Sequence, residues 1–166
     1  MQKHTISVLV NDQPGVLARV ANLFSRRGFN IDSISVGSSE EKGLSRMVIV
    51  TTGDEKTLEQ VTKQLHKLID VIKVQSLSDG PMVAREIVLI KVDATPATRP
   101  EISGIVEPFR AAIVDVGHSS VIVQVTGDSD KIEALTELLR PYGVREISRT
   151  GITAMSRGMA AVKVHA

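Results

Sequence analysis

The chain has 166 residues, of which 42% are apolar, and its 20 basic and 19 acidic side chains leave a net charge of +1. This length fits one compact domain or two small ones. A nearly neutral chain with 2% aromatic residues has little with which to attract a nucleic acid or stack its bases. The absence of cysteine excludes disulfides, thiolate metal sites and cysteine nucleophiles.

The sequence also predicts where the protein works. No apolar run approaches the ~20 residues of a membrane span. From Met1 the chain passes within a few residues into an alternating strand pattern, without the charged and then apolar segment of a secretory signal. We therefore expect a cytoplasmic protein that makes no contact with a membrane.

The first half of the chain predicts six elements in the order β-α-β-β-α-β. Apolar residues alternate in the strands and recur at helical spacing in the helices, and turns rich in Gly, Pro, Asn and Asp separate them. In chain order we expect a strand at 5–10, a helix from Val16 to Gly28, strands at 29–37 and 47–52, a helix at 58–68 and a strand at 71–77. This is the order of the ferredoxin-like split βαβ fold.

Residues 78–81, Ser-Asp-Gly-Pro, indicate a linker, after which the pattern starts again. The second set is a strand at 87–92, a helix at 102–109, strands at 112–116 and 121–126, a helix at 132–139 and a strand at 144–148. Residues 153–166 carry no predicted element. We therefore predict an α+β protein of two tandem ferredoxin-like βαββαβ domains, at residues 1–79 and 80–166.

The two domains share sequence, which indicates two divergent copies of one unit. Residues 48–54 and 121–128 both pass from a valine-rich strand into Thr-Gly-Asp. The apolar positions of the following helices then align at one constant offset, from Leu58 with Ile132 to Leu65 with Leu139.

One loop distinguishes the two copies. Residues 11–17, Asn-Asp-Gln-Pro-Gly-Val-Leu, join the first predicted strand to the first helix, and the second copy lacks this motif. Free N–H groups at a helix start favour a carboxylate, Asp12 can accept hydrogen bonds from an ammonium group, and Asn30 offers a donor and an acceptor. These groups fit the two ends of an α-amino acid, although the same residues are also ordinary turn and capping residues.

The first domain resembles an ACT domain, and the whole chain resembles the small regulatory subunits of acetolactate synthase, also called acetohydroxyacid synthase. The resemblance covers nearly the full length. The segments that carry it are 11–17, 20–33, Leu-Ser-Arg-Met at 44–47, 64–68, 85–87, 149–151 and Met-Ser-Arg-Gly at 155–158. It implies that the first domain senses an effector and dimerises, and that the second is regulatory and contacts a partner.

The resemblance also implies a site. ACT domains typically pair side by side and hold amino-acid effectors between the first loop of one copy and the Asn-bearing strand start of the other. Carried over by position, the effector-binding residues are Asp12, Gly15, Val16, Leu17, Asn30 and Ile31. The effector implied is valine, as feedback inhibitor of valine, leucine and isoleucine biosynthesis. Related loops often have Asn where this chain has Asp12, and the added negative charge favours contacts with an ammonium group.

The remaining expectations concern partners and cofactors. The resemblance implies a homodimer or higher oligomer, formed through the ACT domains, that stimulates a large catalytic subunit. Thiamine diphosphate, Mg²⁺ and FAD belong to that subunit, and we expect no cofactor, metal or catalytic residue in this chain. None of its histidines is paired at metal-ligand spacing beside a carboxylate: they are His4, His66, His118 and His165. Two alternatives stay open, a small enzyme on the same fold and a scaffold subunit that senses nothing.

Overall fold

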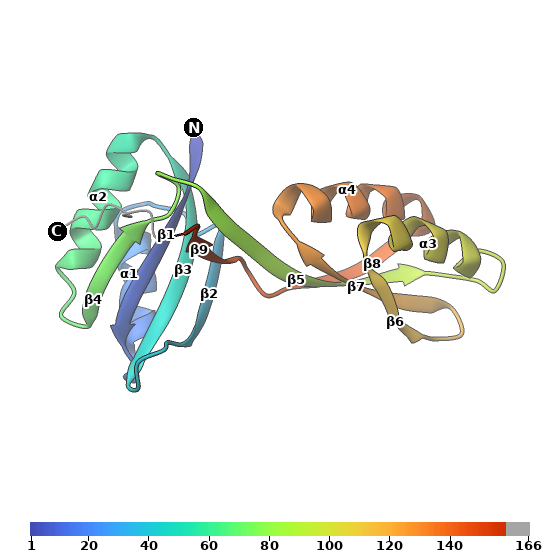
Figure 1. Ribbon diagram of the computed structural model, residues 1–166, viewed down its shortest axis with the longest axis horizontal. Coiled ribbons are helices and arrows are strands. Elements are labelled where there is room, and N and C mark those ends of the chain that lie inside the picture. Colours follow the sequence, from blue (N-terminus) through green and yellow to red (C-terminus); the bar gives the residue numbers. More distant parts are fainter. Residues whose placement is uncertain (159–166) are drawn as a thin grey trace. The chain divides into compact units, whose positions relative to one another are not determined.

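The computed structural model describes residues 1–158, which form two compact units (Figure 1). The first unit contains Met1–Val83 together with the segment that begins at Ile152, and the second is Ala84–Gly151. The sequence placed a boundary at residues 79–80 and assigned everything beyond it to the second domain. The structure instead returns the chain to the first unit after Gly151. Residues 159–166 of the tail lie outside the described part of the chain.

The first unit has the predicted order of elements, and its sheet is antiparallel with strand order β2-β3-β1-β4. The elements are β1 (Gln2–Asn11), α1 (Val16–Arg26), β2 (Ser33–Ser38), β3 (Leu44–Gly53), α2 (Glu55–His66) and β4 (Val71–Ser76). Strand β2 is shorter than the predicted 29–37, because the chain enters the sheet only at Ser33. Asn30 and Ile31 therefore lie just ahead of the strand.

The core of the first unit lies between this sheet and its two helices. Ile6, Val8 and Val10 alternate along β1 toward the helices and are at most 1% exposed. They pack with Val20 and Phe24 of α1 in one cluster that also includes residues of α2. The residues that are buried are thus those expected from the period of two in the strands and of 3.6 in the helices.

The second unit repeats the arrangement with strand order β6-β7-β5-β8. Its elements are β5 (Met82–Asp93), α3 (Arg99–Val106), a 3₁₀ turn at Glu107–Phe109, β6 (Ala112–Val116), β7 (Ser120–Gly127), α4 (Ser129–Leu139), a 3₁₀ turn at Arg140–Tyr142 and β8 (Val144–Arg149). A last strand, β9 (Thr153–Ser156), pairs with β5 and belongs to the first unit. Strand β5 begins five residues before the predicted Ile87, and β9 was not predicted.

The internal repeat is confirmed by what its shared Gly-Asp pair does. Asp54 accepts a hydrogen bond from the Thr57 N–H at 2.7 Å and so caps α2. Asp128 caps α4 in the same way, accepting from the Lys131 N–H at 2.9 Å. The shared motif is a helix start used twice. Within residues 1–158 no helix is long and apolar enough to cross a membrane.

Candidate functional site

The loop between β1 and α1 is held in place by its neighbours on both sides. The N–H of Asn11 donates to the carbonyl of Asp70 at 2.9 Å, and the N–H of Asp12 donates to the carbonyl of Gly43 at 2.9 Å. The loop is thereby fixed between the turn ahead of β4 and the turn ahead of β3. The carboxylate of Asp12 is exposed and available to a ligand.

Helix α1 begins at Val16 without a side-chain cap, after Gly15 in a left-handed conformation with φ 85°. In the described structure the amide groups of Leu17 and Ala18 have no backbone acceptor, as expected for the first turn of a helix. These groups and the helix dipole favour an anion at this end. Val16 is only 3% exposed and belongs to the core, whereas Leu17 is 48% exposed. Of these two side chains, a ligand can therefore reach that of Leu17 but not that of Val16.

Arg19 adds a cation to this loop that the sequence did not single out. Its Nη2 lies 2.7 Å from Oδ2 of Asp70. A Cβ placed on Gly15 would lie 3.0 Å from Nη1 of Arg19, so the guanidinium is beside the glycine. The available signal was its position four residues after Gly15, one helical turn along the chain. The salt bridge to Asp70, 51 residues away, could not be predicted from spacing.

Asn30 and Ile31 form a second group of predicted residues. The side-chain amide of Asn30 donates to Oδ1 of Asp32 at 2.5 Å, and the backbone carbonyl of Asn30 accepts from the Thr51 hydroxyl at 2.6 Å. Oδ2 of Asp32 accepts in turn from the Thr52 hydroxyl at 2.6 Å. Ile31 is partly buried against the core. These contacts fix the segment beside the end of β3 while Asn30 itself is exposed.

The structure does not bring the two groups together within one chain. The loop follows Asn11, which pairs with Leu44 at the start of β3, whereas Asn30 is bonded to Thr51 near its end. Seven residues of extended strand between Leu44 and Thr51 span about 23 Å. The predicted residues therefore form two half-sites at opposite ends of β3.

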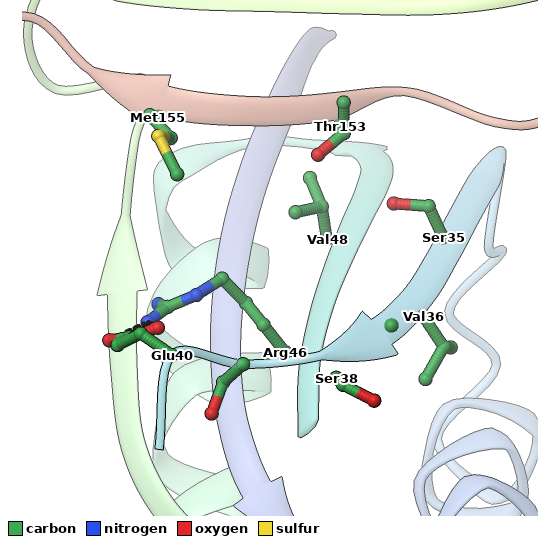
Figure 2. Close-up of a pocket in the computed structure, with 10 residues that line it drawn as sticks. Ser35, Val36, Ser38, Glu40, Arg46, Val48, Thr153 and Met155 are labelled. Carbon is green, nitrogen blue, oxygen red and sulfur yellow. Dashed lines mark hydrogen bonds and ion pairs between the residues drawn. The ribbon is translucent and has the colours of Figure 1, made fainter. Parts of the chain in front are cut away.

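A separate pocket of about 440 Å³ lies on the sheet face opposite the helices (Figure 2). Its lining includes Ser35, Arg46, Val48, Thr153 and Met155 and contains none of the six predicted residues. The pocket lies between β2, β3 and the returning strand β9. It thus marks a place where segments far apart in the sequence meet.

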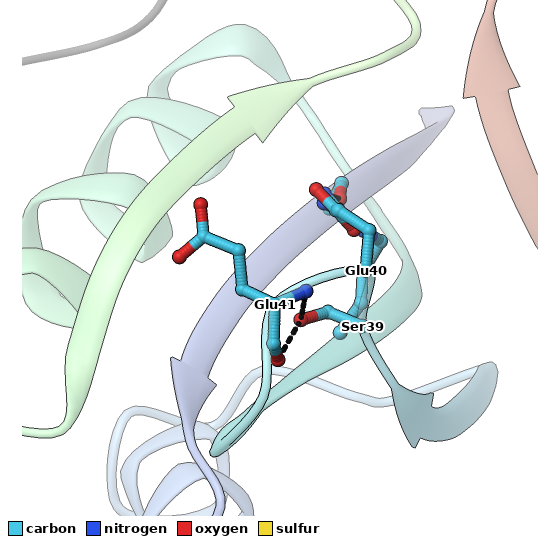
Figure 3. A network of polar contacts seen from close by, with 5 residues as sticks. Ser39, Glu40 and Glu41 are labelled. Carbon is cyan, nitrogen blue, oxygen red and sulfur yellow. Dashed lines mark hydrogen bonds and ion pairs between the residues drawn. The ribbon is translucent and has the colours of Figure 1, made fainter.

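The polar turn between β2 and β3, drawn in Figure 3, contributes Ser39 and Glu40 to the lining of this pocket. The Ser39 hydroxyl accepts from the N–H of Glu41 and donates to its carbonyl, both at 3.1 Å. Glu40 pairs with Arg46 at 3.0 Å. A backbone hydrogen bond within Glu40, followed by the Arg46 guanidinium, holds the pKa of the Glu40 carboxyl below its ordinary value. With Glu40 and Arg46 paired to each other, this turn is best described as a structural connection between β2 and β3.

In the part of the chain that the structure describes, no three His, Asp or Glu side chains gather into a possible metal site. His4 is 3% exposed and its Nε2 lies 3.0 Å from the carbonyl of Gly53. His165 lies outside the described residues. The described half-sites offer charged groups and hydrogen-bond donors and acceptors with which a small polar ligand can be bound.

Comparison with known proteins matches both units to one family. Residues 85–158 match the family described as the small subunit of acetolactate synthase, and residues 6–73 match an acetohydroxyacid synthase small subunit-like ACT domain. The acetolactate synthase small subunit of Mycobacterium leprae is 56% identical over 93% of this chain and 92% of its own length. That of Bacillus subtilis is 53% identical over 94% and 91%.

A solved structure agrees with these matches. The crystal structure of the acetolactate synthase small subunit from Thermotoga maritima superposes with a TM-score of 0.87 at 48% identity, covering 95% of this chain and 99% of that one. The two-unit ferredoxin-like architecture is therefore that of a known protein, and the resemblance stated from the sequence is confirmed.

Proposed function

Because the chain belongs to the family of acetolactate synthase small subunits, we propose that it is a non-catalytic regulatory subunit that binds valine. In this role it makes the activity of a separate catalytic subunit in branched-chain amino-acid biosynthesis depend on the concentration of valine. The observation that carries the proposal is the pair of incomplete half-sites at opposite ends of β3, which a second copy of the chain can complete.

Strand β2 is the element through which two copies would pair. It is an edge strand of its sheet, and an edge strand presents unpaired backbone groups to a partner. Ser38 pairs with Ser45 near the loop end of β3, and Ser33 pairs with Val50 near the Asn30 end. An antiparallel β2–β2 pairing about a two-fold axis would bring the loop of each chain to Asn30 of the other.

The two half-sites offer complementary groups for one α-amino acid. The amides of Leu17 and Ala18 and the guanidinium of Arg19 would take the carboxylate, since all three are donors. The carboxylate of Asp12 and the side-chain oxygen of Asn30 would take the ammonium group. Leu17 and Ile31 would contact the branched apolar side chain of valine, while the charged groups would hold its two ends.

Valine bound between two chains would change the activity of the enzyme by favouring one arrangement of the pair. Such coupling between a ligand and a partner is typically ~1–3 kcal/mol and requires different affinities for the two states. The catalytic subunit would supply thiamine diphosphate, Mg²⁺ and FAD together with all bond-making steps. In this proposal the small subunit stimulates that partner in the cytoplasm and carries no cofactor of its own.

Isothermal titration with L-valine tests the proposal directly, with the purified protein and with its complex with the catalytic subunit. We expect about one valine per chain, since a symmetric pair has one complete site for each loop. Asn30→Ala should lose the binding, whereas Asn22→Ala, at an exposed position of α1, should keep it. If neither the free protein nor the complex binds valine, the subunit is a scaffold. Turnover of keto acids by the protein alone would identify a small enzyme instead.

A further inference from the structure

The segment that returns from the second unit is attached to β2 by two serine side chains. The N–H of Ile152 donates to the Ser33 hydroxyl oxygen at 3.0 Å. The Ser35 hydroxyl donates to the carbonyl of Ile152 at 2.9 Å. Two serines of one strand therefore satisfy both backbone groups of a single residue that lies more than a hundred positions away in the chain. We call this set of three residues the Ile152 latch.

The latch lies over a buried part of the sheet. Ser33 and Ser35 pair with Val50 and Val48 of β3, and directly paired residues share a face of a sheet. This is the face opposite the helices, yet Val48 and Val50 are only 2% and 4% exposed. Figure 2 shows β9 crossing above Val48, with Thr153 beside Ser35. The returning backbone is hydrogen-bonded to both serines and crosses the sheet above Val48.

The position of the latch connects two regions with different proposed tasks. Ser33 opens β2 directly after the Asn30–Asp32 segment, whose last N–H donates to the Val50 carbonyl at 2.8 Å. Ile152 follows Gly151, the last residue of the second unit. The latch therefore joins the Asn30 end of β2 to the point where the chain leaves the second unit.

We propose that the Ile152 latch couples the effector site to the second unit, with Ser33 and Ser35 as positioning residues that do not contact the effector. This inference rests on the proposed function and adds a route to it. When valine occupies the site and β2 shifts, the two hydrogen bonds carry Ile152 along with the strand. The second unit then receives the signal through the covalent chain at Gly151. Without the two hydroxyls, valine binds but its signal is weakened.

The test measures valine binding and valine inhibition separately, in the complex of the full-length protein with its catalytic subunit. The double variant Ser33→Ala/Ser35→Ala removes both latch hydroxyls. Ser38→Ala is the matched control, because it removes an exposed hydroxyl from the same strand. We expect the double variant to bind valine with a dissociation constant within about threefold of the wild type. We expect the ratio of inhibited to uninhibited activity at saturating valine to move about tenfold toward unity, as for the loss of two hydrogen bonds.

Each further outcome decides the matter. Full inhibition in the double variant overturns the latch, and so does loss of valine binding together with inhibition, because the serines would then shape the site itself. Ser33→Thr/Ser35→Thr keeps both hydroxyls and should restore inhibition, which separates the latch from a general loss of folding. A wild-type complex that fails to bind valine contradicts the proposed function and, with it, the latch. A wild type that binds valine, with an inhibited double variant, contradicts the latch alone.

Discussion

Arg19 and Asp70 form an ion pair, with 2.7 Å between Nη2 and Oδ2, that fixes the guanidinium beside Gly15 at the start of α1. The side chain of Arg19 is 49% exposed, and an exposed ion pair contributes little to the free energy of unfolding. The main effect of this ion pair is therefore to fix where the guanidinium of Arg19 lies. It places a cation where the first-turn amides of α1 also point.

The first prediction follows from that position. Arg19→Ala should weaken valine binding about tenfold, since a charge-assisted hydrogen bond to the carboxylate is lost, and should change the melting temperature little. Isothermal titration and thermal unfolding measure the two effects. Arg26→Ala is the matched control, because Arg26 is an exposed arginine at the other end of the same helix. Equal affinities in wild type and Arg19→Ala would remove Arg19 from the site.

The second prediction concerns Gly15→Asp. The new carboxylate would repel the carboxylate of valine, and its Cβ would lie 3.0 Å from Nη1 of Arg19, so we expect valine binding to be abolished. Because Gly15 has φ 85°, the variant should also be less stable by about 1 kcal/mol.

Titration and chemical denaturation distinguish these two effects. Gly158→Asp is the control for backbone strain, since Gly158 has φ 63° with nothing within 4 Å of an added Cβ. It should bind valine normally. A Gly15→Asp protein that retains full valine sensitivity would show that the effector lies elsewhere.

The third prediction uses the separation of the half-sites along β3. Chains carrying Gly15→Asp and chains carrying Asn30→Ala each form dimers in which both sites are damaged. In a mixed dimer, purified with two different tags, both substitutions fall in one site and the other site is intact. The mixed dimer should therefore bind about half as much valine as the wild type. If each site belonged to a single chain, the mixed dimer would bind none.

The fourth prediction concerns pH and the cap of α2. Hydrogen bonds from the Thr57 N–H and then from the Thr57 hydroxyl hold the pKa of Asp54 below its ordinary value of 3.8. A carboxyl with a lowered folded-state pKa stabilises the fold above its unfolded pKa, and this contribution is lost as the pH falls through the folded value. Asp54→Ala should therefore lower the melting temperature at neutral pH, and the difference from wild type should shrink below pH 3.8.

Thermal unfolding followed by circular dichroism over a pH series checks this. Asp115→Ala removes an exposed aspartate of β6 that caps no helix, and it should show no such dependence. A difference for Asp54→Ala that stays constant down to acid pH would contradict the assignment of the cap.

Local patterns predicted most of the fold because these elements depend on residues that are close together in the sequence. The alternation of Ile6, Val8 and Val10 identified β1, and Thr-Gly-Asp identified two helix starts. Strand β9 left no such signal, since it has four residues and its burial comes from distant partners. The start of β5 at Met82 was also missed, since the strand was predicted only at 87–92 and residues 82–86 were left unassigned.

The candidate site divides in the same way. The composition of the 11–17 loop suggested groups that bind an amino acid. The structure shows the free amides at the helix start on which this binding would depend. Residue chemistry already grouped Asn30 with this loop, but the expectation that the Asn30 of a second copy completes the site came from the family resemblance. Spacing could not give it, since the two half-sites lie at opposite ends of β3. Arg19 was missed because its position depends on Asp70, and Ile152 because its two hydroxyl partners are more than a hundred residues away.

The chain order of the first unit also bears on how the protein is synthesised. Strands β1 to β4 leave the ribosome first, but β9 emerges only after the whole of Ala84–Gly151 has been made. At synthesis rates of about 5–20 residues per second this interval lasts some seconds. Throughout it, β9 is not present to cross the sheet above Val48, so the nascent chain exposes more of this apolar face than the finished protein does. The part of the protein that is made first is thus completed last.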